Sequence, residues 1–224
     1  GSKELVAWLP TFLQSQTVLY PKIAYPTYLV GAMLAQSNEI AVDIDASQWP
    51  NADLAWVNSP ANPTGRVHTE AELRAVIQWS RKNKAVVISD ECYLEFGDGV
   101  TPTSIFAYSD GDNSNLLAVH SLSKRSSLAG YRAAFMVGDP ALISAIREIR
   151  KQAGMMVALP VQKAMTAALG DDEHVATARA RYNSRRATLK PALEAAGFRI
   201  EESVAGLYIW CTRNEDAWKS VDWL

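Results

Sequence analysis

The feature that most constrains the fold of this chain is the alternation of short apolar runs with helical patterns through its first two thirds. Runs of strand length stand at residues 54–57, 85–88, 116–119 and 133–137. Continuous apolar runs are typical of strands that are covered on both faces, and alternation with helices favours strand-helix-strand units. We therefore predict an α/β protein with a mostly parallel sheet.

Two helix starts are marked by their capping residues. Thr69 and Glu72 have the spacing of a capping box. Asp139 and Pro140 supply an N-cap and a first-turn proline for a helix that continues to about Gln152. These signals predict helices directly before and after the predicted strands.

The pattern changes near residue 170. Residues 171 to about 196 form one long, charge-rich helical pattern that Gly197 closes, and residues 198–212 predict two strands around a turn. We therefore predict a large domain over residues 1–170. Residues 171–224 are predicted to form a connecting helix and the beginning of a small domain.

The charge balance excludes several kinds of partner. The 224 residues include 22 Lys plus Arg and 24 Asp plus Glu, a net charge of −2. This balance offers no basic surface for nucleic acid or for an anionic membrane. The two cysteines, Cys92 and Cys211, have no metal or redox spacing, and the three histidines are scattered, so we predict no metal site and a cytoplasmic setting.

Both ends of the sequence suggest a fragment. The last residues, Asp222 to Leu224, stop within a helical pattern that has no cap. No segment resembles a signal peptide or a membrane-spanning helix. Gly1-Ser2 is also a common remnant of an expression tag.

Polar side chains gather directly after three of the predicted strands, where ligands bind in a parallel sheet. They are Asn62, Asp90, Tyr93, Ser121, Ser123, Lys124 and, one loop later, Arg132. A lysine that follows a buried strand loses solvation, which makes its amine nucleophilic toward an aldehyde. Serine hydroxyls with an arginine can hold a phosphate, and a carboxylate can hold a positive charge on a ring nitrogen.

Each of these residues also has an ordinary structural interpretation. Asn62-Pro63 is typical of a turn, and Asp90 of a cap or a surface acid. Lys124 and Arg132 taken singly are typical solvated charges, and Tyr25 a packing residue. The prediction of a site therefore depends on their joint arrangement at consecutive strand ends.

Three motifs together resemble those of the class I/II aminotransferases, which are pyridoxal-phosphate enzymes of fold type I. The motifs are Asn62-Pro63-Thr64-Gly65, Ser89-Asp90-Glu91-Cys92-Tyr93, and Ser121-Leu122-Ser123-Lys124 with Gly130-Tyr131-Arg132. The resemblance covers essentially the whole chain. It implies a three-layer α/β/α large domain that binds pyridoxal 5'-phosphate and part of a small α+β domain.

The resemblance also implies a role for each site residue. Lys124 would bond covalently to the cofactor aldehyde and move a proton between Cα and C4′ of the substrate adduct. Asp90 would pair with the ring nitrogen, and Asn62 and Tyr93 would hydrogen-bond the phenolate oxygen. Tyr25 would stack on the ring. The phosphate would be held by Ser121, Ser123 and Arg132 together with the opening residues Gly1, Ser2 and Lys3, at a helix N-terminus that favours an anion.

Substrates and partners follow from the same resemblance. It implies ping-pong transfer of an amino group from an amino acid to a 2-oxo acid by a homodimer. Residues 24–28, 120–126 and 150–156 are similar to actinobacterial succinyldiaminopimelate aminotransferases of lysine biosynthesis, which implies N-succinyl-L,L-diaminopimelate with 2-oxoglutarate. The N-terminal segment that forms the substrate gate in the family, and the arginine that binds the substrate α-carboxylate, have no counterpart in these residues.

Other functions remain open at this stage. A C-S β-lyase would use the same cofactor, because a fold does not determine a reaction. A ligand-sensing domain of a transcription regulator would need a DNA-binding module, and no such segment is visible. Residues 86–91 are also similar to the acidic strand of a P-loop nucleotide hydrolase, but the phosphate-binding loop of that class is absent, as is the Gly-x-Ser-x-Gly motif of serine hydrolases.

Overall fold

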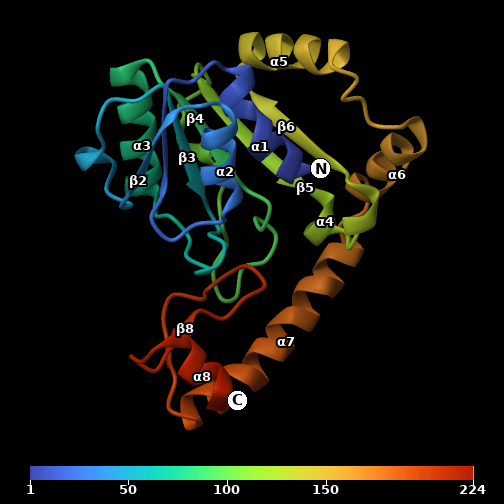
Figure 1. Ribbon diagram of the computed structural model, residues 1–224. Helices are drawn as coiled ribbons and strands as arrows, with labels where there is room; N and C mark the ends of the chain where they lie inside the picture. The colour runs from blue at the N-terminus through green and yellow to red at the C-terminus, as the bar shows by residue number, and fades with distance from the viewer. Residues whose placement is uncertain (224) are drawn as a thin grey trace.

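The computed structural model describes residues 1–223. The chain forms three layers, a central six-stranded sheet with helices on each of its two faces (Figure 1). The strands stand in the order β2-β1-β3-β4-β5-β6, and all neighbours are parallel except β5 and β6, which are antiparallel. Their bounds are β1 Thr17–Pro21, β2 Asn38–Val42, β3 Leu54–Asn58, β4 Val86–Asp90, β5 Leu116–Ser121 and β6 Ala134–Gly138. The predicted mostly parallel α/β sheet is confirmed.

Helices cover both faces of this sheet. Helices α1 (Ser2–Phe12), α2 (Thr27–Leu34) and α5 (Pro140–Gln152) pack on one face, and α3 (Glu70–Asn83) packs on the other. Side chains of β3 alternate between the two cores: Leu54 and Trp56 face α1 and α2, whereas Ala55 and Val57 face α3. This two-sided burial explains why the strands appear in the sequence as continuous apolar runs.

The predicted capping signals are observed. The Thr69 hydroxyl accepts a hydrogen bond from the Glu72 backbone N–H (3.3 Å), and the Glu72 carboxylate accepts one from the Thr69 N–H (2.8 Å). The Asp139 carboxylate accepts from the Ala141 N–H (2.8 Å) at the start of α5. Both helices therefore begin where the sequence indicated.

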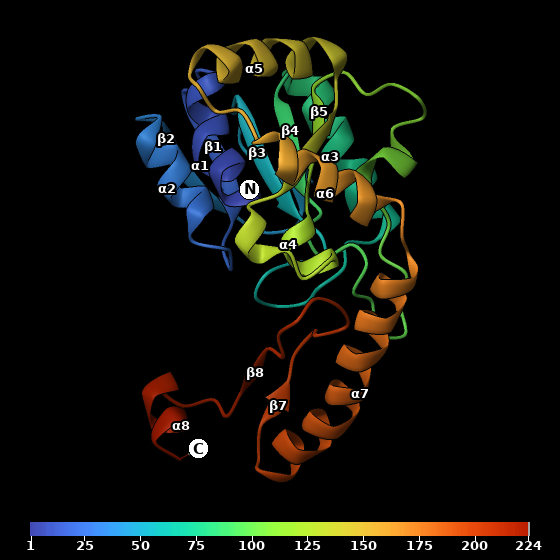
Figure 2. The same cartoon turned by 90° about the vertical axis from the view of Figure 1, so that its right-hand side faces the viewer.

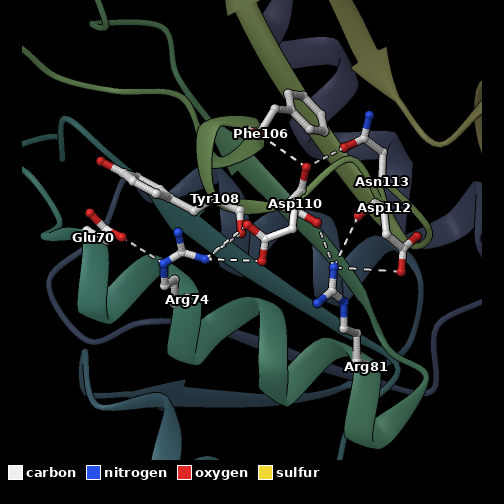
Figure 3. A network of polar contacts seen from close by, with 9 residues as sticks. Glu70, Arg74, Arg81, Phe106, Tyr108, Asp110, Asp112 and Asn113 are labelled. Carbon is white, nitrogen blue, oxygen red and sulfur yellow. Dashed lines mark hydrogen bonds and ion pairs between the residues drawn. The ribbon is translucent and has the colours of Figure 1, made fainter.

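The outer face of α3 is tied to the segment before β5 by two arginines (Figure 3). Arg74 bonds Glu70, Asp110 and the Tyr108 carbonyl, and Arg81 bonds the Ser109 carbonyl. This segment includes the 3-10 helix η2 (Ile105–Tyr108). Exposed ion pairs contribute little to stability, so this face is held chiefly by the apolar core beneath it.

A second, smaller unit lies beyond the sheet (Figures 1 and 2). Helix α6 (Leu159–Leu169) leads to α7 (Glu173–Ala195), and α7 extends from the sheet to the region of β7, β8 and α8. The remaining elements are η1 Ala46–Gln48, α4 Leu122–Arg125, η3 Ala129–Tyr131, β7 Arg199–Ile200, β8 Cys211–Thr212 and α8 Ala217–Trp223. The predicted long helix is confirmed. Among the described residues, none of the helices has the length and apolar character that crossing a membrane requires.

The two strands predicted within residues 198–212 are much shorter than expected. Only Arg199–Ile200 and Cys211–Thr212 pair with each other. The segment between them instead bonds to loops of the large unit, and Ala205 forms a bridge with Gly97. Backbone groups that a hairpin would pair with each other therefore form hydrogen bonds with distant parts of the chain.

Candidate active site

Strands β3, β4 and β5 place three polar residues side by side at the carboxyl end of the sheet. Asn58 and Asp90 are register partners at the ends of β3 and β4, and Ser121 ends β5. Beside them lies a cavity of about 410 Å³. Its walls contain every predicted site residue except Gly1, namely Ser2, Lys3, Tyr25, Asn62, Asp90, Tyr93, Ser121, Ser123, Lys124 and Arg132. They also contain three residues that were not predicted, Cys92, Ala129 and Tyr208.

Asp90 supplies a buried carboxylate to this cavity. One carboxylate oxygen accepts a hydrogen bond from the Tyr28 hydroxyl (2.8 Å), and the other accepts from the Cys92 backbone N–H (3.1 Å). Burial raises the pKa of Asp90, while the bonds from Cys92 and Tyr28 oppose that rise. Asp90 is 6% exposed. Tyr28, on α2, is therefore a supporting residue that the strand-end argument had not predicted.

The loop that carries Asn62 is held in place by Asn58. The Asn58 side-chain amide donates to the carbonyls of Asp90 (2.9 Å) and Pro60 (3.0 Å), and its oxygen accepts from the Asn62 N–H (2.7 Å). Asn58 is 3% exposed, so these bonds satisfy a polar group that would otherwise be costly to bury. The position of Asn62 is thus fixed relative to Asp90.

Lys124 lies on the short helix α4, directly after β5. The Ser121 hydroxyl caps this helix by accepting from the Ser123 N–H (3.2 Å). The turn brings Ser121, Ser123 and Lys124 to the wall of the cavity. One local structure therefore presents two hydroxyls and an amine.

Arg132 approaches the first residue of the chain. A Cβ placed on Gly1 would stand 2.7 Å from one Arg132 guanidinium nitrogen, so a side chain at this position would displace the guanidinium. Gly1 is the N-cap of α1, whose first backbone N–H groups have no partner within the helix. A guanidinium and a helix N-terminus together favour an anion, and Ser2 and Lys3 of the same turn line the cavity.

Aromatic side chains form further walls. Lys3 lies over the Tyr25 ring (5.6 Å from the ammonium to the centroid), and Tyr25 packs edge-on against Tyr28. Tyr93 is buried. Its burial is the largest cause of a raised phenol pKa, and the neighbouring Tyr208 is the second cause, so the Tyr93 hydroxyl keeps its proton and can donate a hydrogen bond. Tyr208 comes from the smaller unit. Nothing in its local sequence indicated that it reaches this site.

A larger cavity of about 730 Å³ lies across the 58–64 segment. Its walls include Trp49 and Trp210, together with charged groups such as Arg66. The Arg66 guanidinium already pairs with Glu72 (2.7 Å) and Glu202 (3.4 Å). None of the predicted site residues lines it, so the smaller cavity is the candidate active site.

Two partly buried histidines predict a pH-dependent stability. Burial lowers the pKa of His68 and of His120 to about 4. As the pH falls below about 6.5, the unfolded chain binds protons that the folded chain resists, so the free energy of unfolding decreases, by about 2 kcal/mol per histidine at pH 5. The raised pKa values of the buried carboxyls Asp90 and Glu91 act in the opposite direction.

Urea unfolding at pH 7 and pH 5 measures the effect of each histidine. We expect the loss between the two pH values to shrink by about 2 kcal/mol in His120→Gln, and by a similar amount in His68→Gln. An unchanged loss in both variants would contradict the assignment.

The cavity fits pyridoxal phosphate by size and by chemistry. Its volume is within the usual range for small-molecule sites. Lys124 can bond an aldehyde, Asp90 can hold a protonated ring nitrogen, and Arg132 can pair with a phosphate. The absent side chain at Gly1 leaves room for the Arg132 guanidinium at the start of α1. The fit therefore rests on charges and shape that the folded chain itself presents.

Comparison with known proteins identifies the family. The profile of the family "Aminotransferase class I and II" matches residues 1–221, and the chain belongs to this family, whose members use pyridoxal phosphate. It is 51% identical to the probable aminotransferase Rv1178 of Mycobacterium tuberculosis over 100% of the chain. It is 49% identical to the 4-dedimethylamino-4-oxo-anhydrotetracycline transaminase OxyQ of Streptomyces rimosus over 99% of the chain. The chain spans 55% and 63% of the lengths of these relatives.

Solved structures share the fold. An aminotransferase from Staphylococcus aureus matches 100% of the chain with a TM-score of 0.89 at 23% identity, and the chain covers 64% of it. The N-succinyldiaminopimelate aminotransferase of Mycobacterium tuberculosis matches 92% with a TM-score of 0.82 at 23% identity, and the chain covers 58% of it. The predicted three-layer architecture of fold type I is therefore confirmed.

Proposed function

We propose that this chain carries the cofactor site of an aminotransferase that moves an amino group from an amino acid to a 2-oxo acid. The observation that supports this most directly is the meeting of Lys124, Asp90 and Arg132 at one cavity. These residues come from separate segments of the large unit, and their chemistries are complementary to one cofactor. Family membership supports the same reaction class.

Lys124 is the proposed catalytic residue. Pyridoxal phosphate, when bound, supplies an aldehyde that condenses with amines and a ring that withdraws electrons. The Lys124 Nζ would hold the cofactor covalently through its aldehyde. As a free amine, Lys124 would accept a proton from the substrate Cα and return it at a neighbouring carbon, as a general acid-base group.

The other site residues orient and neutralise. The buried Asp90 carboxylate would keep a proton on the ring nitrogen of the cofactor. Asn62 and Tyr93 would donate hydrogen bonds to its ring oxygen, and Tyr25 would pack against the ring. The phosphate would be held by Arg132, by the hydroxyls of Ser2, Ser121 and Ser123, and by Gly1 and Lys3 at the start of α1. Each of these groups lines the cavity or, for Gly1, adjoins Arg132.

The organisation of the protein is part of the proposal. We assign residues 1–170 to the cofactor-binding domain and residues 171–224 to the connecting helix and the beginning of a small domain. The direction of α7, away from the sheet, supports this division. A homodimer and a cytoplasmic setting stay predictions from the family resemblance.

For the substrate, N-succinyl-L,L-diaminopimelate with 2-oxoglutarate is our first candidate. Relatives named LL-diaminopimelate aminotransferase, such as that of Gloeobacter violaceus at 28% identity, support a donor with the diaminopimelate skeleton. The identity to OxyQ supports a second candidate, amino transfer to a cyclic ketone of a polyketide. The donor panel described below also distinguishes these two transamination reactions from the β-lyase and ligand-sensing alternatives.

The test is a half-reaction with a panel of amino donors. We expect succinyldiaminopimelate to convert the bound cofactor to its amine form with release of a 2-oxo acid. Cysteine conjugates in the same panel should release no thiol. Absorption spectroscopy and mass analysis of the products measure the outcome. A thiol with pyruvate would support the lyase, while binding with no conversion of any donor would support a sensor.

A further inference from the structure

A short segment of the smaller unit is bonded to the loop that carries Asn62. The Ser203 N–H donates to the Thr64 carbonyl (2.9 Å). The Ala205 N–H donates to the Gly65 carbonyl (3.0 Å). Gly65 has a φ of 70°, and a Cβ on it would stand 2.5 Å from the Ala205 carbonyl oxygen. The two backbones therefore approach closely because this residue has no side chain.

The same segment, residues 203–206, is also bonded to the loop that follows Tyr93. The Gly206 N–H donates to the Phe96 carbonyl (2.9 Å), and the Phe96 N–H donates to the Tyr93 carbonyl (2.9 Å). Phe96 is buried. The segment thus joins two loops, and Asn62 of one and Tyr93 of the other line the candidate active site.

Arg186 of α7 holds this segment through its carbonyl groups. Arg186 is 5% exposed, and its guanidinium donates to the carbonyls of Ser203 (3.0 Å), Ala205 (2.9 Å) and Gly206. The same three residues donate their N–H groups to the two loops. A planar guanidinium with several fixed donors is suited to hold such acceptors together.

Two further side chains of α7 bond the loop that follows Tyr93. The Asn183 amide donates to the Gly97 carbonyl (3.2 Å), and the Lys190 ammonium pairs with the Asp98 carboxylate (3.1 Å). These contacts bring α7 to one of the two loops. Only the Arg186 contacts, by way of the segment, lead to both.

Resting on the proposed cofactor site, we propose that Arg186 is a positioning residue that aligns Asn62 and Tyr93 with the ring oxygen of the cofactor. Arg186 is not among the residues that line the cavity, so it acts through residues 203–206 and the two loops. The strength of a hydrogen bond depends steeply on its distance and angle, so small shifts of these loops weaken both donors. The smaller unit is thereby part of the cofactor site of the larger one.

The test is a pH titration of the visible absorption of the lysine-bound cofactor in the chain and its variants. Donors to the ionised ring oxygen stabilise its negative charge and favour loss of the neighbouring proton, so weaker donors raise the titration midpoint. Arg186→Met keeps the apolar stem but removes the guanidinium, and it should raise the midpoint by about 0.5 pH units. Arg179→Met, the same change at an exposed arginine of α7, should leave the midpoint unchanged.

Removal of the two donors separates positioning from a general loss of stability. In a chain that carries Asn62→Ala and Tyr93→Phe, the addition of Arg186→Met should cause no further rise of the midpoint. A further rise there overturns the inference and leaves the proposed function standing. So does an Arg186→Met chain that is less stable in urea but has the midpoint of the unsubstituted chain.

A second measurement needs no cofactor. Amide hydrogen exchange of the cofactor-free chain, followed by mass spectrometry, should be at least about threefold faster in Arg186→Met for residues 61–66 and 93–98, and unchanged for α3. If Arg186→Met does not fold, Arg186→Lys serves in both measurements, with smaller changes in the same direction, because it keeps the cation but loses the planar fork. A chain without any lysine-bound absorption would refute the proposed function, whereas unchanged exchange of the two loops would refute the role of Arg186.

Discussion

Lys124→Ala is expected to abolish covalent attachment of pyridoxal phosphate to this chain. Lys124 stands on α4 at the wall of the cavity, after the strand that ends at Ser121. Its Nζ is both the proposed point of attachment and the group that moves the proton, so its loss should lower amino transfer by at least about 10³-fold. Borohydride reduction followed by peptide mass analysis measures the attachment directly.

A matched control is Lys163→Ala, which removes an exposed lysine on α6. This variant should keep full attachment and transfer. The outcome that contradicts the proposal is a reduced cofactor found on another residue of Lys124→Ala at the original yield. Lys3 is the residue to inspect, because it is the other lysine that lines the cavity.

Local sequence signals predicted the sheet and two of its helices well. Apolar runs such as Leu54–Val57 are buried on both faces, and the bonds of Thr69 and Asp139 mark helix starts where their side chains indicated. These features depend on neighbours within a few residues. Strands β1 and β2 were not predicted, because their runs are short and β2 is largely exposed at the edge of the sheet.

The candidate site was predictable for a related reason. The carboxyl ends of parallel strands meet, so Asp90 and Ser121 had to lie close together once the strands were known. Tyr28 and Tyr208 follow from no such rule. The first depends on how α2 packs against Trp56 (5.0 Å between ring centroids), and the second on distant bonds of the 203–206 segment.

The short pairing of β7 with β8 shows the limit of pattern arguments. Two strands around a turn at Ala205 and Gly206 were predicted, yet the backbone groups of these two residues bond to Gly65 and Phe96. A buried arginine supplies three further bonds to the same segment. Tertiary partners more than a hundred residues away in the chain thus displaced the local solution.

Asp90→Asn should lower amino transfer by about 10² to 10³-fold while leaving attachment to Lys124 intact. The substitution keeps the shape of the side chain but removes the negative charge that would hold a proton on the ring nitrogen. The groups proposed for the phosphate, such as Arg132 and Ser121, are unchanged, so cofactor binding should persist. Single-turnover rates measure the transfer, and borohydride trapping measures the attachment.

Glu91→Gln is the control that makes this result specific. Glu91 is also buried and is the adjacent residue, but its carboxylate accepts from the Ile105 N–H (2.9 Å) and the Ser104 hydroxyl (3.0 Å) outside the cavity. Loss of this charge should therefore alter stability more than transfer. Equal losses of transfer in the two variants would show that buried charge as such, and not the position of Asp90 at the cavity, supports the reaction. A loss of transfer in Asp90→Asn alone would support the proposed role of this carboxylate, which is to hold a proton on the ring nitrogen.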